Sequence, residues 1–171
     1  MGKVSREQYE QSDAVLSACQ RYRYLLFRRW RGTGTTMLII GLNPSTADAE
    51  QDDPTIRRCV GFAKRCGCVA LYMGNLFGWR ATDPAHLKRV SNPVGPDNND
   101  YLVDMASQSK WIVAAWGANP IATPRGEEVQ RLLRGREIYC LGTTAAGAPR
   151  HPLYLRREAP LVRWCSGESD G

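Results

Sequence analysis

The sequence predicts an α/β fold: a three-layer α/β/α sandwich with a mainly parallel central sheet of about four strands plus an N-terminal edge strand. Continuous apolar runs are typical of strands that are covered on both faces of a sheet. Segments with the start and stop signals of helices separate these runs, and this alternation favours parallel strands. The predicted core strands are 36–42 (TMLIIGL), 68–77 (CVALYMGNLF), 110–117 (KWIVAAWG) and 137–143 (EIYCLGT).

The segment before the first apolar run predicts the edge strand. Residues 19–34 (CQRYRYLLFRRWRGTG) alternate charged with aromatic side chains. The aromatic members Tyr22, Tyr24 and Phe27 favour a strand over a helix. The closing Gly-Thr-Gly is typical of a turn, so we expect this segment to form a hairpin with residues 36–42.

Three segments between the strands predict helices. Residues 54–67 begin with Pro and end with Gly, with Asp53 as the N-cap and a buried face of Ile56, Val60 and Phe62–Ala63. A second helix is expected around residues 99–108. A third is expected over residues 123–135, where Thr123 is the predicted capping residue.

Length and hydropathy predict one domain and no membrane segment. The 171 residues suit a single domain over residues 1–171, with an ordered core over about 14–165. No apolar run approaches the ~20 residues of a membrane helix. The first 13 residues lack the apolar region of a secretory signal. We therefore expect a cytoplasmic protein without a membrane partner, and a monomer.

Charge and cysteine spacing bear on partners and cofactors. The chain carries 23 Lys and Arg against 17 Asp and Glu, a net charge of +6. Arginine dominates, which modestly favours contacts with the phosphates of DNA. Cys59, Cys66 and Cys68 lack the C-x-x-C spacing of zinc sites, and the chain has only two histidines. We expect the six cysteines to be buried free thiols, with no metal and no cofactor.

Polar residues follow each of the four predicted core strands. The strands lead into the segments GLNPS (41–45), GNLFGWR (74–80), WGANP (116–120) and LGTTAAGAPRHP (141–152). The first three contain Asn43, Asn75 and Asn119, and the fourth contains His151. In such sheets ligands bind beyond the carboxyl ends of the strands, so we expect the four side chains to lie on one rim.

Each of these side chains has a functional and a structural interpretation. Asn43 would orient a water or read a base edge, or it would satisfy the backbone of a tight turn. Asn75 follows an apolar strand, and its buried amide requires either a ligand or a loop as partner. His151 follows a Gly-rich loop at the mouth of the last strand. His86 is interpreted as a surface residue of a helix.

The acidic run between residues 48 and 53 is also open to two interpretations. It contains Asp48, Glu50, Asp52 and Asp53. Such residues cap the helix that follows, and Asp53 is the expected N-cap. Alternatively, one carboxylate activates a water, and Asp48, Asp52 and Asp53 are the candidates. A magnesium site is a further alternative, although nothing in the sequence defines its ligands.

Four motifs carry a resemblance to a known family. They are GLNPSTADAEQDDPTIRRC (41–59), NLFGWRATDP (75–84), VGPDNND (94–100) and AWG (115–117). Together they resemble a bacterial family known only as a domain of unknown function, over roughly residues 14–157. The family name by itself implies no activity.

The order of the motifs also resembles, more distantly, the uracil-DNA glycosylase superfamily, whose site lies at the strand ends of an α/β sandwich. The resemblance implies that Asn43 positions a water, that Asn75 reads the flipped base, and that His151 donates to a base carbonyl. The base-binding residues that it implies are Gly41, Leu42, Ser45, Asn75 and Phe77. The iron–sulfur cysteines of some branches are missing, and Asn43 replaces the aspartate base of the fastest branch.

The same resemblance implies a DNA-binding surface beside the pocket. Leu153 or Tyr154 would act as a wedge that fills the gap left by the flipped base. The arginines expected to contact the DNA are Arg80, Arg150, Arg156 and Arg157; a solvated basic strand is the alternative for residues 150–157. Ser45 stands where strict uracil enzymes have an aromatic residue that blocks C5 substituents.

The resemblance therefore implies a monofunctional DNA glycosylase that leaves an abasic site. Its substrate would be a C5-modified pyrimidine, such as glucosylated hydroxymethylcytosine in phage DNA, and its role antiviral defence. Two functions from other classes remain open at this point. One is a non-catalytic reader of a flipped base, and the other is a hydrolase or transferase of free nucleotides that uses magnesium.

Overall fold

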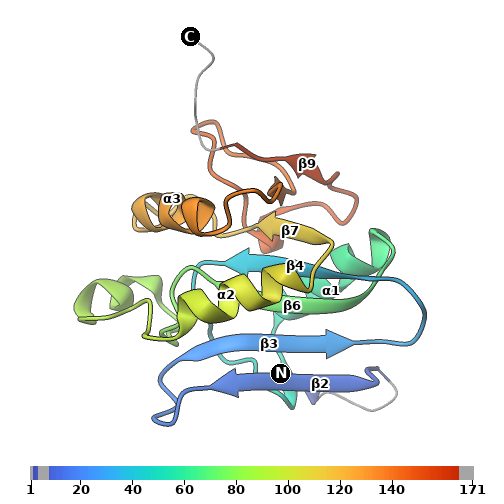
Figure 1. Ribbon diagram of the computed structural model, residues 1–171, viewed down its shortest axis with the longest axis horizontal. Helices are drawn as coiled ribbons and strands as arrows, with labels where there is room; N and C mark the ends of the chain where they lie inside the picture. The colour runs from blue at the N-terminus through green and yellow to red at the C-terminus, as the bar shows by residue number, and fades with distance from the viewer. Residues whose placement is uncertain (1, 4–7, 166–171) are drawn as a thin grey trace.

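The computed structural model describes residues 2–3 and 8–165. Residues 1, 4–7 and 166–171, which the predicted domain includes, lie outside the described residues. A seven-stranded mixed sheet forms the centre, with the strand order β2-β3-β6-β4-β7-β8-β9 (Figure 1). The α/β class is therefore confirmed, but a mainly parallel sheet of about four strands with one edge strand is not what the chain forms.

The predicted core strands lie side by side in this sheet. They are β6 (Cys68–Asn75), β4 (Thr35–Gly41), β7 (Trp111–Ala114) and β8 (Tyr139–Cys140), and their pairings are parallel. Three antiparallel strands widen the sheet: β2 (Gln11–Leu16), β3 (Arg23–Arg29) and β9 (Val162–Arg163). The sequence did not predict β2 or β9, because β2 is a partly exposed outer strand of mixed polar and apolar residues and β9 has only two residues.

The expected hairpin between residues 19–34 and 36–42 is wrong. Strand β3 pairs with β6, where Leu26 faces Met73, and β4 lies on the other side of β6. The backbone N–H of Trp30 still donates to Val69 on β6 at 3.0 Å. Strand β6 is buried along nearly its whole length, as expected for a strand that has a neighbour on each side.

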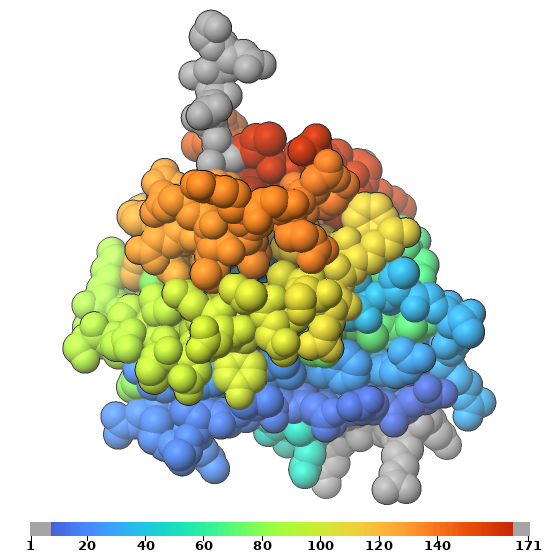
Figure 2. All heavy atoms as spheres, viewed as in Figure 1, coloured from blue at the N-terminus to red at the C-terminus, as the bar shows by residue number. Residues whose placement is uncertain are grey.

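Helices cover both faces of the sheet. On one face α1 (Pro54–Arg65) packs Ile56 and Phe62 against Ile39 of β4. On the other face α2 (Asn98–Ser107) and α3 (Ala122–Leu132) pack against Leu38 and Ile40. Figure 1 shows α2 and α3 in front of the sheet and α1 behind it. Figure 2 shows the same front face, with α2 in yellow-green and α3 in orange.

The helix signals in the sequence were accurate for α1 and incomplete for α3. Asp53 is the N-cap of α1, where its Oδ1 accepts the N–H of Ile56 at 2.9 Å, as predicted. Thr123 does not cap α3, because the helix has already begun at Ala122. Asn119 acts just before this helix instead, since its Oδ1 accepts the N–H of Ile121 at 3.1 Å.

Two short 3-10 helices and a two-stranded ribbon complete the fold. The 3-10 helices are η1 (Pro84–Arg89) and η2 (Pro152–Tyr154), and the ribbon pairs β1 (Gly2–Lys3) with β5 (Gln51–Asp52). Helix η2 packs beside α1 and follows His151 directly. This arrangement brings the last predicted strand-end residue next to the start of α1.

A buried ion pair holds the acidic run against the sheet. The Arg28 side chain is 0% exposed, and its Nε donates to Oδ1 of Asp52 at 2.9 Å. Its Nη2 donates to the carbonyl oxygens of Asp48 and Gln51. The hydroxyl of Tyr9 donates to Oδ2 of Asp52 at 2.7 Å. The buried Arg28–Asp52 pair therefore anchors the loop that leads to Asp53.

The six cysteines are all free, as expected, but not all buried. Cys59, Cys68 and Cys140 are buried and Cys66 is partly buried, whereas Cys19 and Cys165 are exposed. Among the described residues, no three His, Cys, Asp or Glu side chains lie together as a possible metal site. No helix in the described part of the chain has the length and hydropathy needed to cross a membrane.

Candidate functional site

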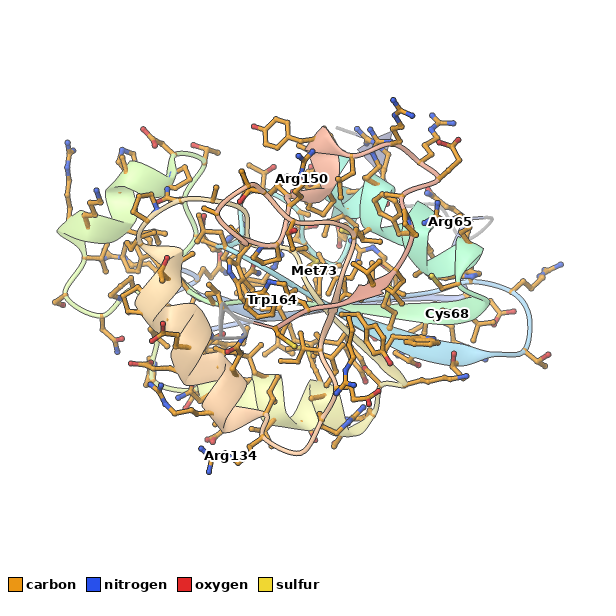
Figure 3. The ribbon with its side chains drawn as sticks, turned by 90° about the horizontal axis from the view of Figure 1, so that it is seen from above. Arg65, Cys68, Met73, Arg134, Arg150 and Trp164 are labelled. Atoms are coloured by element: carbon orange, nitrogen blue, oxygen red, sulfur yellow. The ribbon has the colours of Figure 1, made fainter. Side chains whose placement is uncertain are left out.

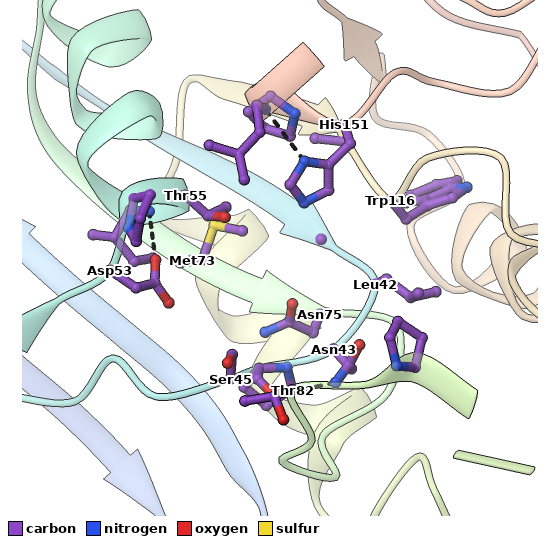
Figure 4. Close-up of a pocket in the computed structure, with 18 of the residues that line it drawn as sticks. Leu42, Asn43, Ser45, Asp53, Thr55, Met73, Asn75, Thr82, Trp116 and His151 are labelled. Atoms are coloured by element: carbon purple, nitrogen blue, oxygen red, sulfur yellow. Dashed lines mark hydrogen bonds between the residues drawn. The ribbon is translucent and has the colours of Figure 1, made fainter. Parts of the chain in front are cut away.

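A cavity of about 430 Å³ lies at the carboxyl ends of the parallel strands. The ends of β4 and β6 form its floor, and the start of α1 and the segment 151–154 form its walls (Figure 4). This is the location that the parallel topology favours for a ligand. The predicted site residues that line it are Gly41, Leu42, Asn43, Ser45, Asp53, Asn75, His151, Leu153 and Tyr154.

Asn75 presents an unsatisfied amide at the floor of this cavity. The residue is 2% exposed, and its Nδ2 is buried without a hydrogen-bond partner in the described part of the chain. Nδ2 of Asn98, itself fully buried, donates to the carbonyl oxygen of Asn75 at 2.9 Å and so fixes the backbone there. A buried N–H without an acceptor costs about 1–3 kcal/mol, so the site favours a ligand that supplies a carbonyl oxygen.

Gly41 allows the Asn75 side chain to occupy this position. A Cβ at Gly41 would come within 2.8 Å of Oδ1 of Asn75 and 3.0 Å of Cε of Met73. Because β4 and β6 pair with Gly41 opposite Asn75, only a residue without a side chain leaves room for that amide. The contact with Asn75 therefore explains on steric grounds why the GLNPS motif begins with Gly.

The contacts of Asn43 are compatible with both of its predicted roles, in the turn and toward a ligand. Its Nδ2 donates to the carbonyl oxygens of Ala81, at 2.8 Å, and Pro44, at 3.2 Å, so it does stabilise the turn. Both amide hydrogens are used in this way. Only Oδ1 therefore remains to interact with a ligand, and it does so as an acceptor. An acceptor at this place suits the orientation of a water molecule.

His151 points into the cavity from the opposite wall (Figure 4). Its Nδ1 accepts the N–H of Leu153 at 3.2 Å, which identifies it as the N-cap of η2. The neutral ring must then carry its hydrogen on Nε2, which makes Nε2 a donor. Burial lowers the pKa of His151 below its usual value, and the nearby Asp53 carboxylate partly opposes this shift. The imidazole is therefore a neutral donor at pH 7.

The lowered pKa of His151 predicts a loss of stability at acidic pH. As the pH falls, the unfolded chain takes up this proton at about 6.5, before the folded chain does. Stability is thus present above pH ~6.5 and is lost as the pH falls toward the lower, folded-state pKa. We expect the melting temperature to fall more between pH 7.5 and 5.5 in the wild type than in His151→Gln. The exposed His86 provides the matched control as His86→Gln; equal pH dependence in all three proteins would contradict the prediction.

Asp53 and Arg23 are charged residues that line the same cavity as Asn75 and His151. Oδ1 of Asp53 caps α1, and the same carboxylate lines the cavity. Arg23 also lines it, is 2% exposed and donates through Nη1 to the carbonyl oxygen of Ala47 at 2.8 Å. Burial lowers the pKa of Arg23 to about 10, and Asp53 opposes this shift, so the guanidinium stays charged at pH 7. Its Nε has no partner among the described residues.

Arg23 and Trp116 also belong to the site, although neither was predicted from the sequence. Trp116 follows β7, lines the cavity and packs edge-on against Trp164, with ring centroids 5.1 Å apart. Gly126 of α3 makes room for it, since a Cβ there would lie 3.0 Å from its ring. The AWG motif contained this signal. Arg23 gave no comparable signal, because it is one of several arginines in the segment 19–34.

Several predicted site residues lie elsewhere. Asp48 does not line the cavity, because its Oδ1 accepts the N–H groups of Glu50 and Gln51 and closes a turn. Phe77 is 5% exposed and packs in the core beneath α2 and α3. Asn119 was expected on the same rim but is used at the start of α3. The acidic residues thus do not converge, and Asp53 is the carboxylate that reaches the cavity.

The predicted DNA-binding arginines also lie outside the cavity, in grooves near it. Arg80 lies in a groove with Trp79, where its Nη1 donates to the carbonyl oxygen of Gln20 at 3.2 Å. Arg150 and Arg156 line a different groove, and Nε of Arg150 donates to the carbonyl oxygen of Thr143 at 3.1 Å. Arg157 lies in a groove along α1. These side chains are at the periphery of the cavity.

The fold is of the α/β class, and its cavity lies at the carboxyl ends of the parallel strands. The chain belongs to the family described as "Protein of unknown function (DUF1643)", whose model matches residues 23–153, more than half of the 171 residues. The expected family membership is confirmed. No curated protein and no solved structure matches the chain.

Proposed function

We propose that this protein is a monofunctional DNA glycosylase that holds a flipped base in the strand-end cavity and hydrolyses its N-glycosidic bond. The observation that carries the proposal is the pair of donors that line one cavity: the unpaired Nδ2 of Asn75 and the Nε2–H of His151. Cleavage leaves negative charge on the departing base. Hydrogen bonds that strengthen as this charge develops lower the barrier.

The remaining polar groups suit the attack of water on the sugar. As the bond between C1′ and the base breaks, positive charge builds on the sugar. Oδ1 of Asn43 would accept a hydrogen bond from the attacking water, and Asp53 would stabilise the positive charge or accept the water's proton. The water oxygen bonds to C1′, and the base leaves with a proton. No lysine is among the described residues that line the cavity, which favours hydrolysis over Schiff-base chemistry.

Two exposed apolar side chains at the cavity mouth are suited to hold DNA open. Leu153 is 41% exposed and Tyr154 is 82% exposed, and both line the cavity. A base must leave the duplex to reach the site, which costs a few kcal/mol. Insertion of one of these side chains into the vacated stack would offset part of that cost.

Ser45 suggests the substrate class within this proposal. It lines the cavity together with Asn43. In the proposed binding mode its small side chain would face C5 of the pyrimidine, where an aromatic residue would exclude a substituent. We propose a C5-modified pyrimidine such as glucosylated hydroxymethylcytosine, excised in the cytoplasm from phage DNA as an antiviral defence. Failure to act on any C5-substituted base, with activity on uracil, would overturn this part.

The test distinguishes an enzyme from a non-catalytic base reader. Short DNAs with uracil, a thymine mismatch, hydroxymethylcytosine or glucosylated hydroxymethylcytosine are incubated with the protein and then cleaved with alkali. For the member that is cut, Asn43→Ala is expected to lower the rate by about 10²–10³-fold and to leave DNA binding unchanged. Asn119→Ala, which also removes an amide that bonds the backbone, is the matched control. Binding without cleavage by the wild type would indicate a reader.

A further inference from the structure

Two arginine-lined grooves leave the cavity on different sides. One runs along α1 and is lined by Arg57, Arg58, Arg65 and Arg157; it shares Pro54 and Leu153 with the cavity. The other is lined by Arg21, Trp79 and Arg80 and shares Ser45, Ala81 and Thr82 with the cavity. Neither groove has an acidic residue among its described lining.

Helix α1 contributes one fixed arginine and two free ones to the groove that runs along it. Arg65 donates to the carbonyl oxygens of Arg157 and Ala159 and lies over the ring of Phe62, 5.3 Å from its centroid. It therefore holds the segment after η2 against α1. The Arg57 and Arg58 guanidinium groups make no hydrogen bond or ion pair to other described residues. These two charges are available to a ligand.

The Trp79 groove offers a charge beside an aromatic ring. The Arg21 guanidinium lies 5.8 Å from the centroid of the Trp79 ring. Tyr22 packs edge-on against the same ring at 5.3 Å and stacks on Tyr24. Aromatic rings next to arginines are typical of surfaces that bind nucleic acid strands through base stacking and phosphate contacts.

We infer that the two grooves and the cavity form one path for a DNA strand, with the nucleotide in the cavity at its middle. The phosphodiester backbone crosses Leu153 and passes along α1 between Arg57 and Arg58 on one side. On the other side it passes Arg21 and Trp79. This inference rests on the proposed function for the identity of the strand. It adds Arg57 and Arg58, which are not among the DNA-binding residues predicted from the sequence.

Neutralising the two free arginines tests the path. Arg57→Gln/Arg58→Gln is compared with Arg131→Gln/Arg134→Gln, a pair of exposed arginines at the far end of α3 with the same change in charge. Figure 3 shows Arg134 on the other side of the sheet from Arg65 of α1. Binding to a short fluorescent single strand and to its duplex is measured as a function of salt, with melting temperatures as the check on folding.

The loss of two phosphate contacts sets the expected result. Affinity for DNA should fall about tenfold at about 0.15 M salt. The slope of log affinity against log salt concentration should become shallower, by about 1.4 on the single strand or about 1.8 on the duplex. Arg57→Lys/Arg58→Lys keeps the charge and should restore most of the binding. The α3 control should bind like the wild type, or nearly so.

The outcomes separate this inference from the proposed function. An α1 variant that binds like the α3 control overturns the path, even if the wild type excises a base. A wild type that binds neither DNA form overturns it as well. Selective loss of binding in the α1 variant supports the path, and does so even if no base is released from any substrate.

Discussion

His151→Ala is expected to lower the rate of base excision by about 10²–10³-fold, the usual effect of removing one donor to a developing negative charge. The donor is Nε2, because Nδ1 is occupied by the N–H of Leu153. His151→Gln, which can still donate, should lose less. The rates are measured in single-turnover assays at pH 7.5, at which the wild-type ring is neutral.

The other histidine provides the control for this result. His86 is exposed on η1 and does not line the cavity, so His86→Ala should excise at the wild-type rate. Because His151 caps η2, the melting temperature of His151→Ala must also be measured. A folded His151→Ala protein with wild-type activity would show that this side chain does not assist the leaving base.

Arg28→Met is expected to lower the free energy of unfolding by about 3–5 kcal/mol. The substitution keeps the length of the side chain but leaves Asp52, 3% exposed, without its cationic partner. It also removes the donors to Asp48 and Gln51, so the loop before Asp53 loses its anchor. Urea unfolding of the purified variants gives the measurement.

A neighbouring arginine gives a matched comparison. Arg29 is partly exposed and lies 3.8 Å from Glu10, so Arg29→Met should cost about 1 kcal/mol or less. Arg28→Met/Asp52→Leu should recover part of the loss, since it removes both buried charges. The account of this anchor is wrong if Arg28→Met and Arg29→Met are equally stable.

The sequence was most informative where local signals determine the structure. The apolar run from Met37 to Ile40 is fully buried, and Pro54 with Asp53 marks the start of α1 correctly. These features depend on burial and on capping within a few residues. The strand-end rule likewise placed Asn43, Asn75 and His151 on one cavity, because parallel strands end at a common edge.

The pairing of strands that are distant in the sequence could not be predicted. The turn after β3 has the residues of a hairpin, yet β6 lies between β3 and β4. Nothing near residues 32–34 indicates which distant strand will take that place. The same limit explains the errors at the site. Arg23 contacts Ala47 and Phe77 packs in the core under α2 and α3, and these neighbours are distant in the sequence. Asp48 is held away from the cavity by the turn that it closes.

The anchored acidic run explains the junction between β4 and α1. Of its carboxylates, Asp52 pairs with Arg28, Asp48 closes a turn and Asp53 caps α1 at the edge of the cavity. This division of roles fixes the loop that carries Asn43 and Ser45. The proposed chemistry therefore depends on a buried charge pair that never touches the ligand.

The most direct test of the proposed function is a mass spectrum of the small molecules released when the wild-type protein acts on the panel of modified DNAs. We predict a free base from one member of the panel, in an amount equal to the abasic sites formed. Release of a nucleoside or nucleotide, or of nothing from DNA that the protein binds, would contradict the proposed glycosylase activity.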